Sequence, residues 1–290
     1  MRLATRGSLL ARWQTNHVAA LLGVEPELVI VETLGDQRRD VPVEELDGTG
    51  TFVTEVRQAV LDGRADAAVH SAKDLPSAPV EGLCIVSVPE RGDARDALVG
   101  STLSGLPPGA LVGTGSARRR VQMANLRPDL QFGPLRGNIE TRIAATGQKF
   151  AAVIVAAAAL QRLGLSYRAG QPLDVESFVP QPGQGALAVE CRADDARSIA
   201  TVAAIEHRGT RLAVDCERAF LAEVGGGCGA PLGAYAEVDA NGLILATGVL
   251  ADGQGALFRH SVTGSDPERV GRALALALRA LAPAVEAGER

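Results

Sequence analysis

The sequence predicts an α/β protein with two doubly wound domains followed by a small α+β domain. From residue 2 to about residue 191, short apolar runs alternate with segments of helical apolar spacing, which is typical of parallel, doubly wound sheets. After residue 207 the pattern changes to one long helix, three strand-like runs and a final helix. A chain of 290 residues is long enough for domains of this kind. We expect domain 1 at residues 1–94 and 186–204, domain 2 at 95–185, and domain 3 at 205–290.

The first domain is expected to begin with a strand directly at residue 2. Ser8 can cap the following helix, because its hydroxyl can accept a hydrogen bond from a backbone N–H of the first turn. A polar, glycine-bearing segment at residues 35–50 is long enough to form a loop. The expected elements are strands 2–6, 28–34, 66–71 and 83–88, and helices 8–22 and 52–61.

The second and third domains are expected to be joined to the first through breaker-rich segments. Residues 91–96 are predicted to carry the chain out of the first domain, and residues 179–185, with two prolines and two glycines, to bring it back. Asp266 and Pro267 mark the start of the last helix. The expected elements are strands 110–113, 130–135, 151–155, 186–191, 232–238, 243–250 and 257–262, and helices 116–125, 138–146, 207–224 and 267–281.

Composition excludes several classes of protein. A net charge of −5 argues against general nucleic-acid binding, and no run of eighteen apolar residues predicts a membrane span. The N-terminus shows no signal-peptide pattern, so we expect a cytoplasmic protein. The four cysteines lack paired spacing, and Cys84 and Cys191 lie within apolar runs expected to be core strands. The four histidines show no ligand spacing either, and no metal site is predicted.

The segment from His70 to Pro76 carries the first candidate chemistry. It follows an apolar run, and the carboxyl ends of strands in open α/β sheets are where such proteins bind ligands. Lys73 is one of only two lysines among the 29 basic residues, which suggests a role that arginine does not fill. The alternative is that Lys73 and Asp74 form an ordinary solvated turn. His70 is expected to be a packed strand residue and not a base.

Arginines concentrate in the second domain. Six of them lie between residues 117 and 142, where only Asp129 and Glu140 are acidic. Arginine binds carboxylates through two parallel hydrogen bonds, and the Gly113–Ser116 turn before a helix adds backbone N–H donors. These features indicate a ligand with several carboxylates or phosphates. The alternative is a set of surface arginines in a lysine-poor protein.

Cys228 lies in a glycine-rich loop, where glycines allow another molecule to approach the sulfur closely. It is a candidate nucleophile, although a single cysteine in such a loop is usually inert.

Seven motifs together resemble one family, the porphobilinogen deaminases, also called hydroxymethylbilane synthases. They occur in the family's order and extend along nearly the whole chain, so the set is far more specific than any one match. The motifs are Ala4-Thr5-Arg6-Gly7-Ser8, Val69–Pro76, Gly113–Arg119, Leu135-Arg136-Gly137-Asn138, Gln161–Leu165, Gly183-Gln184-Gly185-Ala186 and Gly226-Gly227-Cys228.

The resemblance implies two domains related to periplasmic-binding-protein lobes and a third domain that carries a dipyrromethane cofactor. That cofactor would be held by a thioether to Cys228. The implied reaction joins four porphobilinogen units to it, with loss of ammonia each time, and releases hydroxymethylbilane for tetrapyrrole and haem biosynthesis. We expect a monomer that acts on this small molecule, without nucleic-acid or membrane partners.

The resemblance also assigns roles to residues. Asp74 corresponds to the family's catalytic carboxylate, which stabilises the positive charge that develops at the pyrrole N–H groups. The arginines correspond to positions that bind carboxylates, Lys73 and Ser8 to positions that bind cofactor or substrate side chains, and Gln184 to one that shapes the interdomain cleft. The remaining candidates are grouped by the molecule that they are expected to bind. They are, for the cofactor, Cys228, Ser8, Lys73, Thr114, Ser116, Arg118, Arg119, Arg136 and Gly137, and for the substrate, Arg6, Arg142, Arg162 and Gln184.

One loop departs from the family pattern. Glu45 and Thr49 stand where relatives have lysines, and Arg38 and Arg39 in the same loop could compensate.

Two alternatives to the enzyme remain open at this point. One is a two-lobed small-anion binding protein of the same ancestral fold, which needs neither Cys228 nor a third domain, and the other is a family member with altered activity. Hinge motion is expected at residues 91–96 and 179–185, because one site makes four successive bonds.

Overall fold

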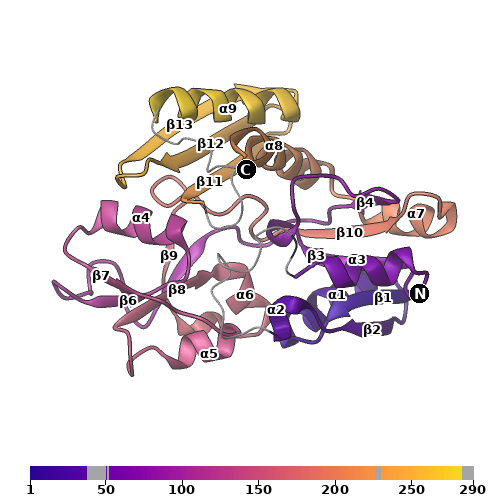
Figure 1. The fold of residues 1–290 in the computed structure, drawn as a ribbon, viewed down its shortest axis with the longest axis horizontal. Coiled ribbons are helices and arrows are strands. Elements are labelled where there is room, and N and C mark those ends of the chain that lie inside the picture. The colour runs from indigo at the N-terminus through magenta and orange to yellow at the C-terminus, as the bar shows by residue number, and fades with distance from the viewer. Residues whose placement is uncertain (38–49, 51, 226–229, 283–290) are drawn as a thin grey trace.

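The computed structural model describes residues 1–37, 50, 52–225 and 230–282, and these residues form three β-sheets with flanking helices. We call the sheets N-terminal, middle and C-terminal. In Figure 1 the N-terminal and middle sheets lie side by side, and the C-terminal sheet lies above them. Residues 38–49, 51, 226–229 and 283–290 are outside the described part, and they include Arg38, Arg39, Glu45, Thr49 and Cys228.

The N-terminal sheet has the strand order β2-β1-β3-β10-β4. Its core forms where the central strands β1 and β3 bury side chains such as Leu3 and Val69 against Val18 of α1. Ser8 caps α1 as predicted, accepting a hydrogen bond from the Ala11 N–H at 3.2 Å. The elements of this sheet are β1 (Arg2–Arg6), β2 (Glu27–Val31), β3 (Ala67–Ser71), β4 (Leu83–Ser87), β10 (Leu187–Arg192), α1 (Leu9–Leu22), α2 (Leu34–Gln37), α3 (Thr54–Leu61), η1 (Ala72–Asp74), α7 (Ala196–Val202) and η3 (Ala203–Ile205).

The middle sheet repeats this arrangement with the order β7-β6-β8-β5-β9. β8 is fully buried, and Leu98, Val112 and Ile154 pack with Met123 of α4 in its core. The sequence pattern did not predict β9, an edge strand that contains Pro172; proline is tolerated at sheet edges. The elements are β5 (Asp96–Val99), β6 (Leu111–Gly113), β7 (Gln131–Gly133), β8 (Ala152–Ala156), β9 (Ala169–Leu173), α4 (Ala117–Leu126), α5 (Ile139–Ala144), α6 (Ala157–Arg162) and η2 (Ser166–Arg168).

Both sheets are mixed: the doubly wound α/β fold class is confirmed, but the strands are not all parallel as the alternation of strands and helices predicts. β1, β2 and β3 run parallel, but β10 is antiparallel to β3 and β4. Likewise β6, β7 and β8 run parallel, but β5 is antiparallel to β8 and β9. An apolar run has the same pattern in either direction. Here β5 and β10 are the strands that enter each sheet after the chain has crossed from the other one.

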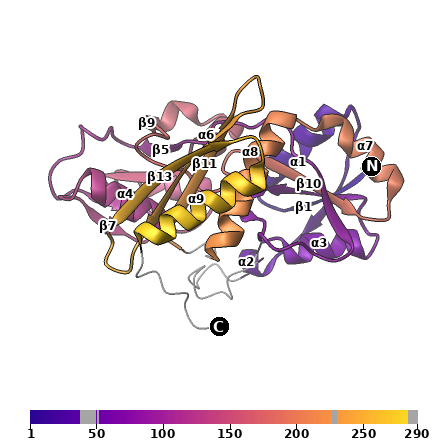
Figure 2. The same ribbon diagram turned by 90° about the horizontal axis from the view of Figure 1, so that it is seen from above.

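The C-terminal sheet is an antiparallel meander, β11-β12-β13, as the sequence predicts. Figure 2 shows α9 lying along it, and Leu274 and Leu278 of α9 pack with Phe220 of α8 and Ile244 of β12 in one core. Asp266 caps α9 and Pro267 begins it, as expected. The elements are α8 (Arg208–Val224), β11 (Leu232–Val238), β12 (Ile244–Ala251), β13 (Leu257–Gly264) and α9 (Pro267–Leu281).

A buried carboxylate in α8 joins the two crossing segments to the C-terminal sheet. Glu217 is 1% exposed and pairs with Arg91 on the outgoing crossing, Nη1 to Oε1 at 2.6 Å. Its other oxygen accepts from the Gly183 N–H of the returning crossing at 2.6 Å, and Oε1 also accepts from the Ala236 N–H of β11 at 2.9 Å. Both crossings and the C-terminal sheet therefore meet around one side chain.

Two classes of structure are missing from the described residues. None of their helices combines the length and apolar character that crossing a bilayer requires. Among the same residues, no cluster of three or more His, Cys, Asp or Glu side chains could hold a metal ion.

Candidate active site

Lys73 and Asp74 lie at the carboxyl end of β3, as the sequence predicts. The short helix η1 continues from the strand, and the Ala72 N–H donates to the Ala186 carbonyl at 3.0 Å. The Gln181 side chain donates to the Lys73 carbonyl at 3.2 Å. The returning crossing therefore fixes the backbone of the two charged residues, which are half-buried.

Asp74 and Lys73 line a cavity of about 100 Å³ in the N-terminal half of the molecule. Arg6 at the end of β1 and Ser8 at the start of α1 also line it. The Arg6 guanidinium lies 4.3 Å from the centre of the Phe52 ring. The lining thus includes one carboxylate, two cationic groups, two hydroxyl groups and an aromatic ring. That combination suits a small ligand with both an aromatic ring and acidic groups.

A second, smaller cavity connects Lys73 to the other two sheets. Ser116 and Arg118 of the middle sheet line it, together with Leu232 of β11 and Ala230. Ala230 is the first described residue after the segment 226–229, which contains Cys228. Lys73 lines both cavities, so it lies between Asp74 and the part of the chain that leads to Cys228.

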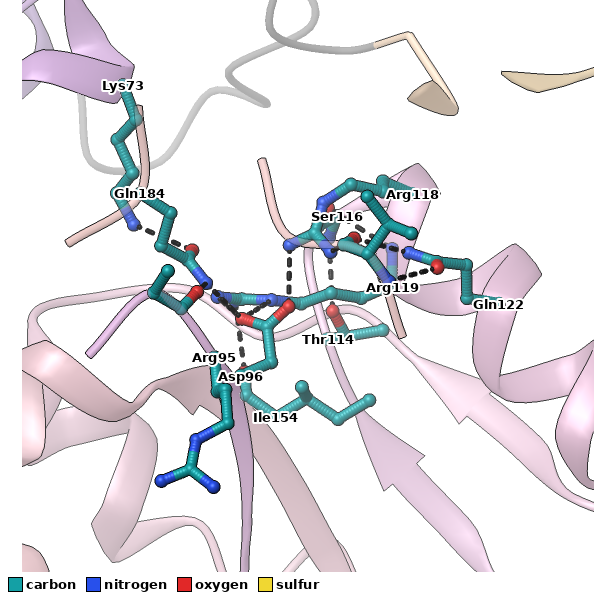
Figure 3. Close-up of polar contacts among 12 residues, drawn as sticks. Lys73, Arg95, Asp96, Thr114, Ser116, Arg118, Arg119, Gln122, Ile154 and Gln184 are labelled. Atoms are coloured by element: carbon teal, nitrogen blue, oxygen red, sulfur yellow. Dashed lines mark hydrogen bonds and ion pairs between the residues drawn. The ribbon is translucent and has the colours of Figure 1, made fainter. Parts of the chain in front are cut away.

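Asp96 is the centre of the arginine cluster, and sequence analysis did not identify it. Figure 3 shows the guanidinium groups of Arg118 and Arg119 meeting its carboxylate. Arg119 Nη2 lies 2.6 Å from Oδ1 and Arg118 Nη2 lies 2.8 Å from Oδ2, and the Gln184 amide donates to Oδ1 at 3.0 Å. Burial alone would raise the pKa of Asp96, but the two arginines hold it well below its usual range. In the sequence, the only feature that could have identified Asp96 is its position directly before an apolar run.

Each of the two arginines also donates to a backbone carbonyl. Arg118 donates to the Val179 carbonyl at 2.7 Å, and Arg119 to the Ile154 carbonyl at 3.1 Å. Both guanidiniums are almost completely buried, and burial lowers the pKa of Arg118. This cluster therefore holds the middle sheet to the returning crossing at residue 179.

The turn before α4 is closed by its own hydroxyl groups. Ser116 caps the helix, accepting from the Arg119 N–H at 3.4 Å, and Thr114 Oγ1 accepts from the Ser116 N–H at 3.2 Å. These bonds orient the first turn of α4, from which Arg118 and Arg119 project toward Asp96.

Lys73 is linked to this cluster through Gln184. Its Nζ lies 3.4 Å from Gln184 Oε1, while the amide nitrogen of Gln184 reaches Asp96 (Figure 3). Burial is the main cause that lowers the pKa of Lys73 to about 8; Arg119 and Arg118 act in the same direction, and Asp74 and Asp96 oppose them. The ammonium therefore loses its proton near pH 8.

Arg142 and Arg136 bring further positive charge to the same region. Arg142 donates to the Gly137 carbonyl at 2.8 Å, and Gly137 has a φ of +96°. Burial, followed by the charges of Arg119 and Arg136, lowers the pKa of Arg142 to about 10, while Asp74 opposes the shift. The charges of Arg119, Arg136 and Asp74 therefore all act on the Arg142 guanidinium.

Arg162 lies between the N-terminal and middle sheets. It donates to the Gly185 carbonyl at 2.6 Å, and its guanidinium lies 5.7 Å from the centre of the Trp13 ring in α1. Burial lowers its pKa to about 10. Among the predicted site residues, Arg6, Ser8, Lys73 and Asp74 line the first cavity, Lys73, Ser116 and Arg118 line the second, and Arg119 and Gln184 contact Asp96. Thr114, Arg136, Gly137, Arg142 and Arg162 line neither cavity, and Cys228 lies outside the described residues.

Two family models match this chain. The model "Porphobilinogen deaminase, dipyromethane cofactor binding domain" matches residues 1–200, and "Porphobilinogen deaminase, C-terminal domain" matches residues 211–280. The second match includes a third domain, which the two-lobed binding-protein alternative does not need.

Relatives from several bacteria are similar over nearly the whole chain. The porphobilinogen deaminase of Acidothermus cellulolyticus is 47% identical over 288 residues, which is 95% of this chain and 87% of the relative. That of Brevibacillus brevis is 44% identical over 289 residues, which is 96% of this chain and 94% of the relative. Among solved structures, a Salmonella typhimurium periplasmic binding protein with high arginine specificity aligns with a TM-score of 0.39 and 11% identity, over 73% of this chain and 93% of that one. Because both family models and these two relatives match the chain over most of its length, this chain belongs to the porphobilinogen deaminase family.

Proposed function

We propose that this protein is a hydroxymethylbilane synthase that joins four porphobilinogen molecules, releasing ammonia at each addition, and then frees the linear tetrapyrrole by hydrolysis. The observation that carries the proposal is the placement of Asp74 and Lys73 at the end of β3, between a cavity lined by Arg6 and Ser8 and the arginine cluster around Asp96. Family membership supports the same reaction.

The donor groups near Lys73 suit a dipyrromethane, whose acetate and propionate groups are anionic. Lys73, Ser116 and Arg118 line the cavity next to Ala230, two residues from Cys228. An ammonium, a hydroxyl and a guanidinium are the groups that bind carboxylates best. When bound through Cys228, the dipyrromethane supplies the electron-rich pyrrole carbon to which the substrate is joined.

We assign catalysis to Asp74. Its carboxylate can accept hydrogen bonds from the pyrrole N–H of porphobilinogen and stabilise positive charge that develops on that ring. The same oxygens can take and return a proton. Lys73 keeps a cation beside this carboxylate below about pH 8.

The arginines are proposed to bind the carboxylates of the growing chain. Each charge-assisted contact contributes about 1.5–3 kcal/mol, so several together can hold a flexible polyanion. The proposed sets are, for substrate, Arg6, Arg142, Arg162 and Gln184, and for the cofactor, Ser8, Lys73, Thr114, Ser116, Arg118, Arg119, Arg136 and Gly137.

We also propose that the three sheets correspond to domains at residues 1–94 with 186–204, 95–185 and 205–290. The two crossings between the N-terminal and middle sheets support the division of domain 1 into two stretches.

The protein is proposed to act as a monomer in the cytoplasm on a small molecule, without a nucleic-acid or membrane partner. The net charge of −5 supports the absence of a nucleic-acid partner.

Turnover of porphobilinogen and the intact mass of the purified protein test this function together. We expect hydroxymethylbilane to form and the mass to exceed that of the chain by two linked pyrrole units. Asp74→Asn should keep that added mass and lose about 10²–10⁴-fold in kcat, because the amide keeps the shape without the charge. The exposed Asp194→Asn is the matched control and should keep full activity.

Cys228→Ser tests the anchor independently of activity. We expect this variant to fold and to carry no pyrrole adduct by mass spectrometry. Added mass on the serine variant would contradict the assignment of Cys228. Added mass without turnover in the unmodified protein would favour the family member with altered activity.

A further inference from the structure

Two cysteines lie opposite each other where the chain leaves and re-enters the N-terminal sheet. Cys84 is on β4, the last strand before the outgoing crossing, and Cys191 is on β10, the first strand after the return. The antiparallel register of β4 and β10 pairs these two residues directly. The stretch between them contains the entire middle sheet.

Their placement fits the dimensions of a disulfide bond. Directly opposite residues of an antiparallel pair have side chains on the same face and Cα atoms about 4.5–5.5 Å apart. A disulfide spans Cα separations of about 4.4–6.8 Å. The Cys84 Sγ donates to the Cys191 carbonyl oxygen at 3.8 Å, so this thiol already contacts the backbone of its partner.

The two thiols differ in their access to solvent. Cys84 is half-buried and Cys191 is fully buried. Burial raises the pKa of both, and that of Cys191 to about 12, so neither reacts quickly at neutral pH. A small oxidant can reach Cys84 first, and Cys191 is then the adjacent thiol that completes the reaction.

We propose that Cys84 and Cys191 form a reversible disulfide. This bond would join the two strands between which the chain forms the middle sheet. In the first step the Cys84 thiolate attacks a low-molecular-weight disulfide such as oxidised glutathione, which forms a mixed disulfide and releases one thiol. In the second step the Cys191 thiolate attacks the Cys84 sulfur and releases the second thiol. Two thiols of the protein are oxidised, one small disulfide is reduced to two thiols, and the two protons go to the released thiols.

The bond would constrain the unfolded chain more than the folded one. It would close a loop of about 100 residues, and the stabilisation from such a closure grows with loop length. Because β4 and β10 are already paired, the folded protein needs little rearrangement to form it. We therefore expect a rise in Tm of about 5–10 °C on oxidation, reversed by dithiothreitol.

The test uses the purified cofactor-bearing protein incubated with oxidised glutathione at about pH 8.5, where thiolates are more abundant. After alkylation of the remaining thiols, peptide mapping by mass spectrometry should find the Cys84 peptide joined to the Cys191 peptide. Cys216→Ser, at a buried cysteine in α8, is the matched control and should keep the cross-link.

Cys84→Ser and Cys191→Ser should each remove the cross-link and the oxidation-dependent rise in Tm. The proposal is overturned if, after oxidation, both cysteines of the unmodified protein are still free thiols that the alkylating reagent modifies. It is equally overturned if oxidation stops at a glutathione adduct on Cys84 alone, since the partner thiol would then be out of reach.

Discussion

Arg91 and Glu217 form a two-point ion pair between the outgoing crossing and α8: Nη1 lies 2.6 Å from Oε1, and Nη2 lies 3.1 Å from Oε2. Glu217 is almost fully buried, and it accepts two further hydrogen bonds from backbone N–H groups at Gly183 and Ala236. One carboxylate thus fixes the position of the C-terminal sheet relative to both crossings.

Replacing Glu217 with alanine should lower the free energy of unfolding by about 3–5 kcal/mol, because Arg91 would stay buried without its partner. Chemical denaturation followed by circular dichroism measures this change. Glu268→Gln is the matched control. Glu268 pairs with Arg272 at 3.5 Å on the surface, so the control should change stability by less than about 1 kcal/mol. Equal effects of the two substitutions would contradict the role of Glu217.

Gly183 is predicted to position the catalytic segment. Its φ is +75°, and a Cβ there would lie 2.9 Å from the Lys73 backbone nitrogen and 3.0 Å from the Ala72 carbonyl carbon. Gly183→Ala should therefore displace η1 and lower kcat/KM for porphobilinogen by at least about tenfold. Gly147→Ala is a matched control, because Gly147 has a φ of +77° with nothing within 4 Å of the added Cβ. If both variants lose the same activity, backbone strain and not the contact with Lys73 explains the effect.

Lys73 should set the alkaline limb of the pH profile. Its pKa of about 8 is below the ordinary value of 10.5, so the cation beside Asp74 is lost as pH rises through 8. We expect kcat/KM, which reports the free enzyme, to fall above about pH 8. Lys73→Arg should keep its charge and move this limb upward by more than one pH unit. Lys149→Arg changes the only other lysine and should leave the limb where it is, and an unchanged limb in Lys73→Arg would exclude this role.

Glu190 should stabilise the N-terminal sheet in a pH-dependent way. Arg57 binds it with two hydrogen bonds of 2.7 Å, and His70 Nε2 lies 3.2 Å from the same carboxylate. Burial would raise the pKa of Glu190, but the bonds from His70 and Arg57 lower it from the ordinary 4.5 to about 2. Ionised Glu190 therefore contributes on the order of 3 kcal/mol to the free energy of unfolding. This contribution is fully present above pH 4.5 and is lost as pH falls through 2.

Thermal unfolding from pH 7 to pH 2 checks this prediction. The stability difference between the unmodified protein and Glu190→Gln should shrink as the pH falls from 4.5 to 2. Exposed Glu81→Gln is the control and should follow the unmodified protein throughout. A difference that stays constant over this range would show that the charge of Glu190 contributes nothing.

Much of the site can be predicted from local sequence. The apolar run before His70 fixed the end of β3, and Ser8, Ser116 and Asp266 cap the helices that they were expected to begin. His70 is buried beside Glu190, so the prediction of a packed strand residue is confirmed. The helix caps depend on a few neighbouring residues, because their hydrogen bonds are made within one turn.

The direction of β5 and β10 and the partners of the arginines depend on tertiary structure. Asp96 is 22 residues from Arg118 and 88 from Gln184 in the sequence, and Glu217 is 126 from Arg91. No local pattern distinguishes a carboxylate that will be buried from one at the surface, because its burial is decided by which strands the chain places beside it. The sequence by itself determined most of the elements, the concentration of positive charge and the strand end that carries Asp74. Only the tertiary structure decided which charges pair, because a buried ion pair forms only where the folded chain excludes water from both partners at once.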